Sequence, residues 1–198
     1  MKESTSKIRT IMYVALFLLA GGIATFKLWQ YYQQQPPLPD LGIVSDFSLM
    51  TADRKAFTHQ DFIGKVTITD FIFTTCAGPC PIMSGQMQQL QATLHENSSI
   101  QFVSFSVDPE YDTPEILTEY ATRYGAIKDK WIFLTGEKKT IYDITKNSFH
   151  LSVEDDENAV LHSTKFVLVD QEARIRGYYD SEDEESLKKL IEDTKSLL

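Results

Sequence analysis

Two cysteines, Cys76 and Cys80, are the only cysteines in this chain of 198 residues, and three residues separate them. An apolar run rich in β-branched residues (66–73) precedes the pair, and a stretch with helical character begins at Cys80 and ends at about Glu96. Because this pattern predicts a buried strand followed by a helix, both sulfurs are expected in the loop between them, where functional sites are commonly built. Backbone N–H groups at such a position favour the thiolate. The pair therefore predicts a site with thiol chemistry.

The first 29 residues predict a membrane anchor. Residues 10–26 carry no charge, and Arg9 and Lys27 flank them. Because the Lys27 side chain can reach the membrane surface, the apolar span extends to residue 29 and comprises about 20 residues, enough to cross a bilayer. Basic residues before the span keep the N-terminus on the cytoplasmic side. A cleaved signal peptide is the alternative, since Gly22-Ile23-Ala24 resembles a cleavage site, but the length of the span and the aromatic residues after it favour the uncleaved anchor.

The predicted organisation separates this anchor from one soluble domain. It comprises a cytoplasmic N-terminus (1–9), a transmembrane anchor (10–29), a tether rich in proline and glutamine (30–40) and a domain (41–198) that is long enough to bury a core of its own. Residues 33–198 carry 15 basic and 27 acidic side chains, a net charge of −12. This charge excludes binding to nucleic acid or to anionic lipid through bulk electrostatics.

Strands and helices alternate along the predicted domain. A βαβ unit followed by a β-hairpin and a terminal helix is the plan of the thioredoxin-like fold, so we expect an α/β domain of that class. In this fold a cysteine pair after the first core strand carries thiol chemistry. The segment 150–161 is expected to be an exposed insertion. The expected strands are 44–50, which opens a small hairpin, 66–73, 100–107, 131–134, 164–170 and 175–178, and the expected helices are 80–96, 113–125, 137–147 and 182–197.

Three separated stretches of the sequence resemble the Sco/SenC family over roughly residues 40–195. They read FIFTTCAGPCPIMSGQM, SVDPEYDTPEILTEYATRYG and LHSTKFVLVD. Members of this family are membrane-anchored, thioredoxin-fold copper proteins that help to assemble the CuA centre of cytochrome c oxidase. The resemblance implies that Cys76, Cys80 and His162 are copper ligands and that Asp108 is associated with the site. Two departures from the family, Ala77 in place of a common proline and the turn 171–173 without its usual glycine, involve no ligand.

The implied ligands suit copper in both of its oxidation states. Soft thiolates select Cu(I), and imidazole accepts both Cu(I) and Cu(II). The spacing of Cys76 and Cys80 also places their Cα atoms about 6 Å apart if the loop is helical, so the same pair can form a redox-active disulfide. No proline occurs between residues 115 and 198. The cis-proline that thioredoxin-like oxidoreductases usually keep near the position of His162 is therefore absent, which favours a metal site over disulfide exchange.

The first functional hypothesis is a copper metallochaperone rather than an enzyme. It is a single-pass protein of the cytoplasmic or inner membrane, with its C-terminal domain on the extracytoplasmic (periplasmic) side. It binds one Cu(I) or Cu(II) ion through Cys76, Cys80 and His162. Its partner is the CuA subunit of cytochrome c oxidase, and other copper chaperones are further partners. Nothing in the sequence specifies the oxidation state delivered, the oxidase served or the oligomeric state.

Two other functions use the same cysteines. An extracytoplasmic thiol-disulfide reductase that keeps the CuA cysteines of the oxidase reduced would need Cys76 and Cys80 but not His162. A peroxidase would need the pattern Thr-x-x-Cys, but here the threonines lie one and two residues before Cys76, at Thr75 and Thr74. No basic partner for its thiolate is evident either. Replacement of His162 separates the metallochaperone from the reductase, because a dithiol activity does not require an imidazole.

Simpler roles remain for each of the singled-out residues. A structural disulfide between Cys76 and Cys80 would close a very short loop and so add little stability. Asp108 could do no more than cap its own turn. Met83 and Met87 are soft ligands one helical turn apart, but such pairs more often pack in a core. The remaining histidines lack a partner pattern and are expected at the surface: His59, His95 and His150.

Overall fold

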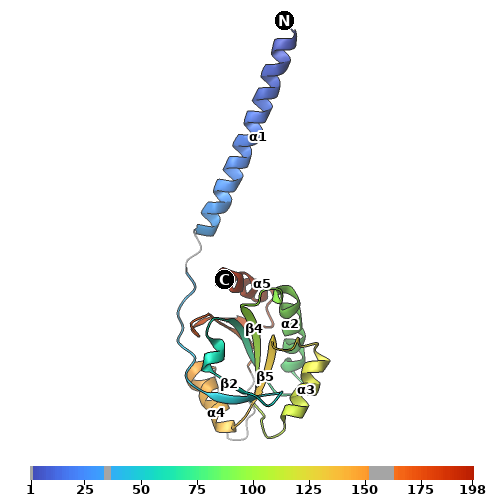
Figure 1. Cartoon of the computed structure of the whole chain (residues 1–198), viewed down its shortest axis with the longest axis vertical. Coiled ribbons are helices and arrows are strands. Elements are labelled where there is room, and N and C mark those ends of the chain that lie inside the picture. The colour runs from blue at the N-terminus through green and yellow to red at the C-terminus, as the bar shows by residue number, and fades with distance from the viewer. Residues whose placement is uncertain (1, 34–36, 152–162) are drawn as a thin grey trace. The chain divides into compact units, whose positions relative to one another are not determined.

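The computed structural model describes residues 2–33, 37–151 and 163–198 and divides into two compact units, Met1–Pro37 and Leu38–Leu198. The first unit contains helix α1 (Lys2–Gln33), within which the predicted anchor 10–29 lies (Figure 1). In the part of the chain that the structure describes, no helix is both long enough and apolar enough to cross a membrane. The membrane anchor therefore stays a prediction.

The second unit is built on a mixed sheet in the order β2-β1-β5-β4-β3-β6-β7. The three central strands, β3, β4 and β5, are parallel, and an antiparallel hairpin extends the sheet on either side (Figure 1). Every residue of β3 is buried, as expected for a strand covered on both faces. The strands are β1 (Ser48–Thr51), β2 (Ala56–Thr58), β3 (Val66–Ile72), β4 (Ile100–Ser106), β5 (Trp131–Thr135), β6 (Lys165–Val169) and β7 (Ile175–Asp180).

Helices cover both faces of this sheet and bury two hydrophobic clusters. One cluster packs α2, α3 and α5 against the sheet and contains both cysteines. The other packs η1, α4 and η2 against the opposite face and is rich in phenylalanine. The helices are the 3-10 turn η1 (His59–Phe62), α2 (Pro79–Leu94), α3 (Pro114–Arg123), α4 (Lys138–Asp143), the π-helical turn η2 (Ile144–Ser148) and α5 (Glu184–Ser196).

Local sequence signals predicted α3 correctly but not the segment 137–147. Thr113 caps α3 by accepting a hydrogen bond from the Ile116 N–H, Pro114 occupies the first helical position, and the chain leaves the helix at Gly125, which has a φ of +64°. The segment 137–147 is instead a short α-helix followed by the wider turn η2. This turn is closed by a hydrogen bond of 3.0 Å from the Phe149 N–H to the Ile144 carbonyl, and both side chains enter the core.

The predicted strand 44–50 is wrong over its first half. Residues 41–44 pair with the turn between β6 and β7, and only Ser48–Thr51 forms a strand. The Val44 N–H donates to the Ala173 carbonyl at 2.9 Å, and the Leu41 N–H donates to the Ile175 carbonyl at 2.9 Å. Hydrogen bonds to a segment about 130 residues away therefore decide this conformation, which local propensity does not encode.

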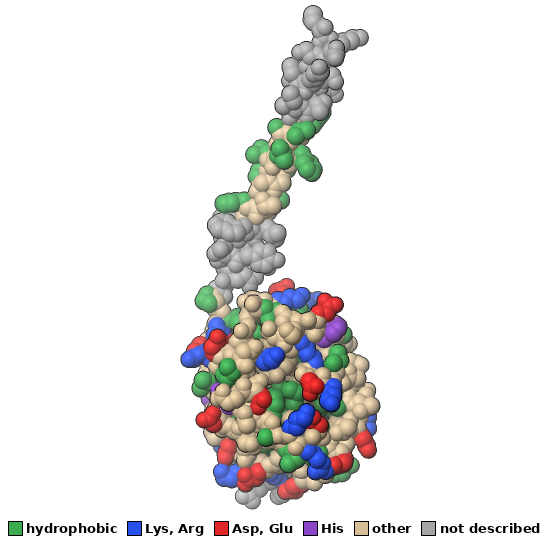
Figure 2. All heavy atoms as spheres, viewed as in Figure 1, with side chains coloured by type: hydrophobic (Ala, Val, Ile, Leu, Met, Phe, Trp, Pro, Cys, Tyr) green, Lys and Arg blue, Asp and Glu red, His purple; other side chains and the backbone are tan. Residues whose placement is uncertain are grey.

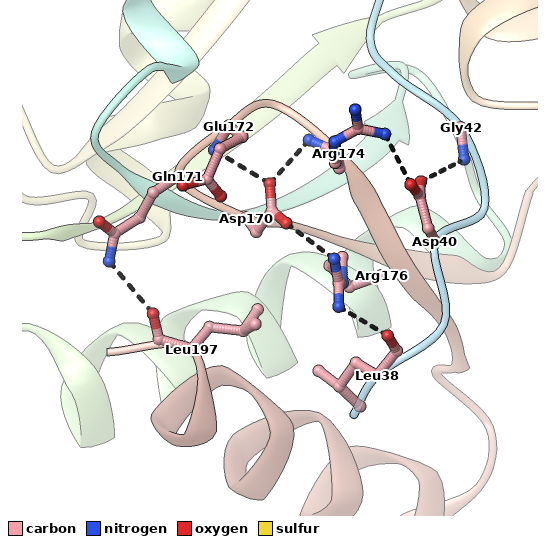
Figure 3. A network of polar contacts seen from close by, with 9 residues as sticks. All are labelled: Leu38, Asp40, Gly42, Asp170, Gln171, Glu172, Arg174, Arg176 and Leu197. Carbon is pink, nitrogen blue, oxygen red and sulfur yellow. Dashed lines mark hydrogen bonds and ion pairs between the residues drawn. The ribbon is translucent and has the colours of Figure 1, made fainter. Parts of the chain in front are cut away.

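Two arginines on the β6–β7 hairpin hold the start of the second unit (Figure 3). Arg176 forms a largely buried ion pair with Asp170 at 3.2 Å and donates to the Leu38 carbonyl at 2.6 Å. Arg174 pairs with Asp40 at 2.6 Å in a more exposed position. These contacts fix the point at which the chain enters the domain.

Replacing Arg176 by methionine is expected to lower the free energy of unfolding by about 1–3 kcal/mol, because it removes one charge-assisted hydrogen bond from the buried Asp170 and one from the Leu38 carbonyl. Chemical unfolding of the full-length protein in mild detergent measures this loss. Arg174→Gln is the matched control and should cost much less, since its ion pair is exposed. Equal losses in the two variants would show that burial of the Arg176 pair is unimportant.

Candidate metal centre

The two cysteines lie where β3 gives way to α2. Cys76 is in the connecting loop, whereas Cys80 already belongs to the first turn of α2, which Pro79 opens. Both are free thiols, and their exposed fractions are only 8% and 3%. The prediction of a thiol pair between strand and helix is confirmed, with the correction that only the first sulfur is carried by the loop.

Burial controls the acidity of the Cys80 thiol. Desolvation raises its pKa to about 12, the neighbouring Cys76 and Asp70 add to the rise, and the backbone of Phe73 opposes it. A backbone hydrogen bond at Phe73 does favour the Cys80 thiolate, as expected, but desolvation is the larger effect and the pKa rises. At Cys76 a backbone N–H does approach the sulfur, since the Gly78 N–H donates to Sγ at 3.4 Å. The free Cys80 side chain is thus a protonated thiol at neutral pH.

The loop after β4 lies beside the cysteine loop, because β3 and β4 are parallel neighbours. The Val107 N–H donates to the Ile72 carbonyl at 2.9 Å at this edge of the sheet. Asp108 is half-buried, its N–H donates to the Ser106 hydroxyl at 3.2 Å, and its carbonyl accepts the Asp112 N–H at 2.8 Å. The backbone of Asp108 takes part in this turn, while a capping role of its side chain and its association with the metal both stay predictions.

A second aspartate of this loop, Asp112, was not among the predicted site residues. Its side chain is fully buried and joins the two loops. The carboxylate accepts hydrogen bonds from the Thr74 N–H at 3.1 Å, from the Thr74 hydroxyl and from the Ser106 hydroxyl at 2.6 Å. Burial raises the pKa of this carboxyl, and the bonds from Ser106 and Thr74 oppose the rise. In sequence the only signal was a second aspartate after the Asp-Pro pair, directly before the residue that caps α3.

His162 lies outside the described residues, so its predicted role as a ligand rests on topology. Strand β6 is antiparallel to β3, with Thr69 opposite Val167, and begins at Lys165. The chain therefore enters β6 at the same end of the sheet at which β3 leads into the cysteine loop. Among the described residues alone, no group of three or more His, Cys, Asp or Glu side chains could hold a metal ion. The set of two cysteines and one histidine stays a prediction.

The alternative soft ligands are part of the core, as predicted. Met83 and Met87 have exposed fractions of 0% and pack in the same cluster as the cysteines. Of the other histidines, His95 and His150 are exposed as expected, whereas His59 is half-buried.

A hollow of about 640 Å³ lies away from the cysteines, toward the starts of β4 and β5. Figure 2 shows hydrophobic atoms surrounded by charged side chains of both signs on this face of the second unit. Its charged lining residues are three acids and three bases, so no one sign of charge marks it for a ligand: Asp53, Asp61, Asp129, Lys55, Lys65 and Lys128.

Comparison with known proteins identifies the family. The model of the SCO1/SenC family matches residues 36–198. The chain belongs to the SCO1/SenC family. The SCO1 protein homolog of Bacillus subtilis is 33% identical over 187 residues, which cover 92% of each chain. BsSco, a Sco-family cytochrome c oxidase assembly protein with an identified disulfide switch, is 34% identical with a TM-score of 0.72 over 82% of this chain and 98% of that chain.

A more distant Sco protein has been solved with its metal. The structure of Arabidopsis thaliana ScoI with copper bound is 26% identical, has a TM-score of 0.64 and covers 78% of this chain and 99% of that chain. The SCO1/SenC assignment and these structures confirm the expected α/β fold of the thioredoxin-like class.

This SCO1/SenC domain also buries an aspartate that is not one of the predicted site residues. Asp70 lies on β3 between Ile68 and Ile72, which belong to the cluster of the two cysteines. It is fully buried, and neither of its carboxylate oxygens has a hydrogen-bond partner among the described residues. Desolvation raises its pKa to about 7, although the side chain of its strand partner Ser104 offsets part of the rise. An acid in the run 66–73, otherwise typical of a core strand, was the signal that could have identified it.

Proposed function

We propose that this SCO1/SenC protein is a copper metallochaperone that carries one copper ion on Cys76, Cys80 and His162 and delivers it to the CuA subunit of cytochrome c oxidase. The observation that carries the proposal is the pair of buried, free thiols at the end of β3, in a family with a copper-bound member. The protein is a carrier rather than an enzyme. Copper is its cargo.

The donor set fits the cargo. Two thiolates bind Cu(I), and an imidazole allows the ion to be held as Cu(II) as well. Burial of Cys76 and Cys80 keeps water from the ion, so release requires that ligands of the acceptor replace those of the carrier one by one. Such an exchange changes no oxidation state and needs no free copper. Other copper chaperones would load the site by the same exchange in reverse.

The proposal places the domain outside the cytoplasm. Residues 10–29 would be the uncleaved anchor in the cytoplasmic or inner membrane, and residues 30–40 the tether to a periplasmic domain. The uncharged span and the basic residues before it support this arrangement. The acidic domain would then meet its partner at the membrane surface, where the CuA subunit is also expected.

A second candidate is a thiol-disulfide reductase that acts on the CuA cysteines of the oxidase. The disulfide switch identified in BsSco favours it, because two free thiols separated by three residues in this chain could undergo the same change. In this reaction the two thiols would become a disulfide while a disulfide of the oxidase becomes two thiols. This activity requires no imidazole.

Anaerobic copper titration of the full-length protein in mild detergent tests the metallochaperone. The wild-type protein should form a one-to-one complex with intense thiolate-to-copper charge-transfer bands. His162→Ala should weaken binding by at least about 100-fold, since even residues that only orient ligands commonly contribute about 10- to 100-fold. His95→Ala, at an exposed histidine, is the matched control and should change nothing.

The two candidate functions give different results in the same variants. Full copper affinity in His162→Ala would contradict the three-ligand site. Loss of copper binding together with an unchanged rate of disulfide reduction would show that the imidazole serves the metal alone. Oxidation of the wild-type pair to a disulfide without a stable copper complex would instead support the reductase.

A further inference from the structure

Asp112 links the cysteine loop to the loop after β4. Its carboxylate is fully buried and takes hydrogen bonds from three donors: the backbone N–H of Thr74, the hydroxyl of Thr74 and the hydroxyl of Ser106. Thr74 stands only two residues before Cys76, whereas Asp112 lies 38 residues further along the chain. A charged acceptor strengthens each of these bonds. The link is therefore a strong long-range constraint on the segment that carries Cys76.

The position of Asp112 is itself fixed. Strand β4 leads directly to Ser106, and the Asp112 N–H donates to the Asp108 carbonyl at 2.8 Å, which folds the loop back toward β3. Thr113, the next residue, caps α3. Asp112 is thus held between the end of a central strand and the start of a helix. Its hydrogen bonds to Thr74 attach that residue to both elements.

The two cysteines depend on this link to different degrees. Cys80 lies in α2, where the helix backbone holds it. Cys76 lies in a loop that continues through the exposed Ala77 and Gly78, and the glycine has an unusual backbone conformation (φ −107°, ψ −118°). On the other side of Cys76, its N–H bonds the Phe73 carbonyl at 3.2 Å. The hydrogen bonds between Thr74 and Asp112 therefore hold the backbone just before Cys76 and so constrain the position of its sulfur.

We propose that Asp112 is a positioning residue that holds Cys76 at the place where its sulfur can act together with that of Cys80. For the metal this inference rests on the proposed copper function, since a preorganised pair of sulfurs binds an ion more tightly than a mobile pair. The same geometry also governs how readily the two thiols close into a disulfide. That second consequence does not depend on copper.

The experiment compares Asp112→Asn and Thr74→Val with the wild-type full-length protein in mild detergent. Asp112→Asn keeps the size of the side chain but removes its charge, and Thr74→Val removes only one of the donors. Asp193→Asn is the matched control, because Asp193 is also a buried carboxylate, bonded to the Tyr179 hydroxyl at 2.6 Å and to Lys189 on α5. Global stability is measured for every variant, so that positioning is separated from loss of structure.

Two readouts are metal-free. The first is hydrogen exchange at the Thr74 amide, which should accelerate in Asp112→Asn. The second is the equilibrium between the Cys76–Cys80 dithiol and oxidised glutathione, in which one disulfide forms in the protein while glutathione disulfide becomes two thiols. We expect the effective concentration of the two protein thiols to fall about 10-fold in Asp112→Asn, and less in Thr74→Val, while Asp193→Asn changes neither readout.

The third readout is copper affinity, expected to fall about 10- to 100-fold in Asp112→Asn with its charge-transfer bands altered. A wild-type protein that binds no copper would overturn the proposed function, while the glutathione equilibrium would still decide the role of Asp112. Thiol equilibria that match those of Asp193→Asn, despite faster exchange at Thr74, would overturn the inference, because the loop would then be loosened without moving Cys76.

Discussion

Replacing Asp70 by asparagine is expected to change the stability of the domain more favourably at about pH 8 than at about pH 4, with a difference of about 4 kcal/mol between the two pH values. The reason is the unpartnered, fully buried carboxyl, whose pKa rises from 3.8 to about 7 because of desolvation. The folded protein therefore holds this proton more tightly than the unfolded chain does. The contribution of this group to the free energy of unfolding is therefore fully present below pH 3.8. It is lost as the pH rises through about 7, where the folded protein gives up the proton.

Asparagine has nearly the shape of the protonated carboxyl but cannot ionise, so it removes the pH-dependent loss, while the cost of burying its amide group is the same at both pH values. Denaturant unfolding of the full-length protein under reducing conditions, followed by circular dichroism at the two pH values, measures the difference. Asp143→Asn, on an exposed ion pair with Lys139, should leave stability unchanged at both pH values. An equal effect of Asp70→Asn at the two pH values would contradict the raised pKa of this carboxyl.

The same replacement bears on the thiol site. The Asp70 carboxyl contributes to the raised pKa of Cys80. The free-energy cost of burying this acid therefore arises beside the hydrophobic cluster that contains both cysteines. Acids that are buried without a partner are uncommon and costly, and such groups occur at functional sites more often than elsewhere. Asp70→Asn therefore tests whether the core beneath the cysteines tolerates charge only at a cost to stability.

Local chemistry made parts of this structure predictable. The apolar run before Cys76, the cap at Thr113 and the glycine at residue 125 are signals that act over a few residues, and the elements they predict are present. The thioredoxin-like order of elements followed from the alternation of such signals. The position of the cysteine pair between a strand and a helix was also predictable, and the pair stays a candidate site because nothing in a core strand or a helix requires two thiols at that spacing.

The missed features depend on contacts between distant segments. Residues 41–44 are held by hydrogen bonds to residues 173–175, and Asp112 meets Thr74 across 38 residues. In both contacts, the sequence around the two segments contains no local signal that predicts the contact. Asp70 was missed for another reason, since one acid does not change the apolar character of its strand, and only the packing shows that both carboxylate oxygens lack a partner.

The phenylalanine-rich face of the sheet gives the second large effect. Phe105 on β4 is fully buried and contacts three other rings, with centroid distances of 4.9 Å to Phe71, 5.6 Å to Phe149 and 6.0 Å to Phe47. Phe105→Ala is expected to lower the free energy of unfolding by about 3–5 kcal/mol, because it removes buried surface and leaves a cavity. Phe105→Leu, which keeps most of the volume, should lose considerably less.

This cluster lies on the face of the sheet opposite the cysteines, so stability and metal affinity should respond separately. Under conditions in which Phe105→Ala remains folded, its copper dissociation constant should equal that of the wild-type protein within about twofold, since distant sites are usually additive. Titration of the variant at low temperature, alongside its unfolding curve, measures both quantities. A large loss of copper affinity in the folded variant would contradict this expectation. It would show that packing on the far face of the sheet helps to position the cysteine loop through the strands between the two clusters.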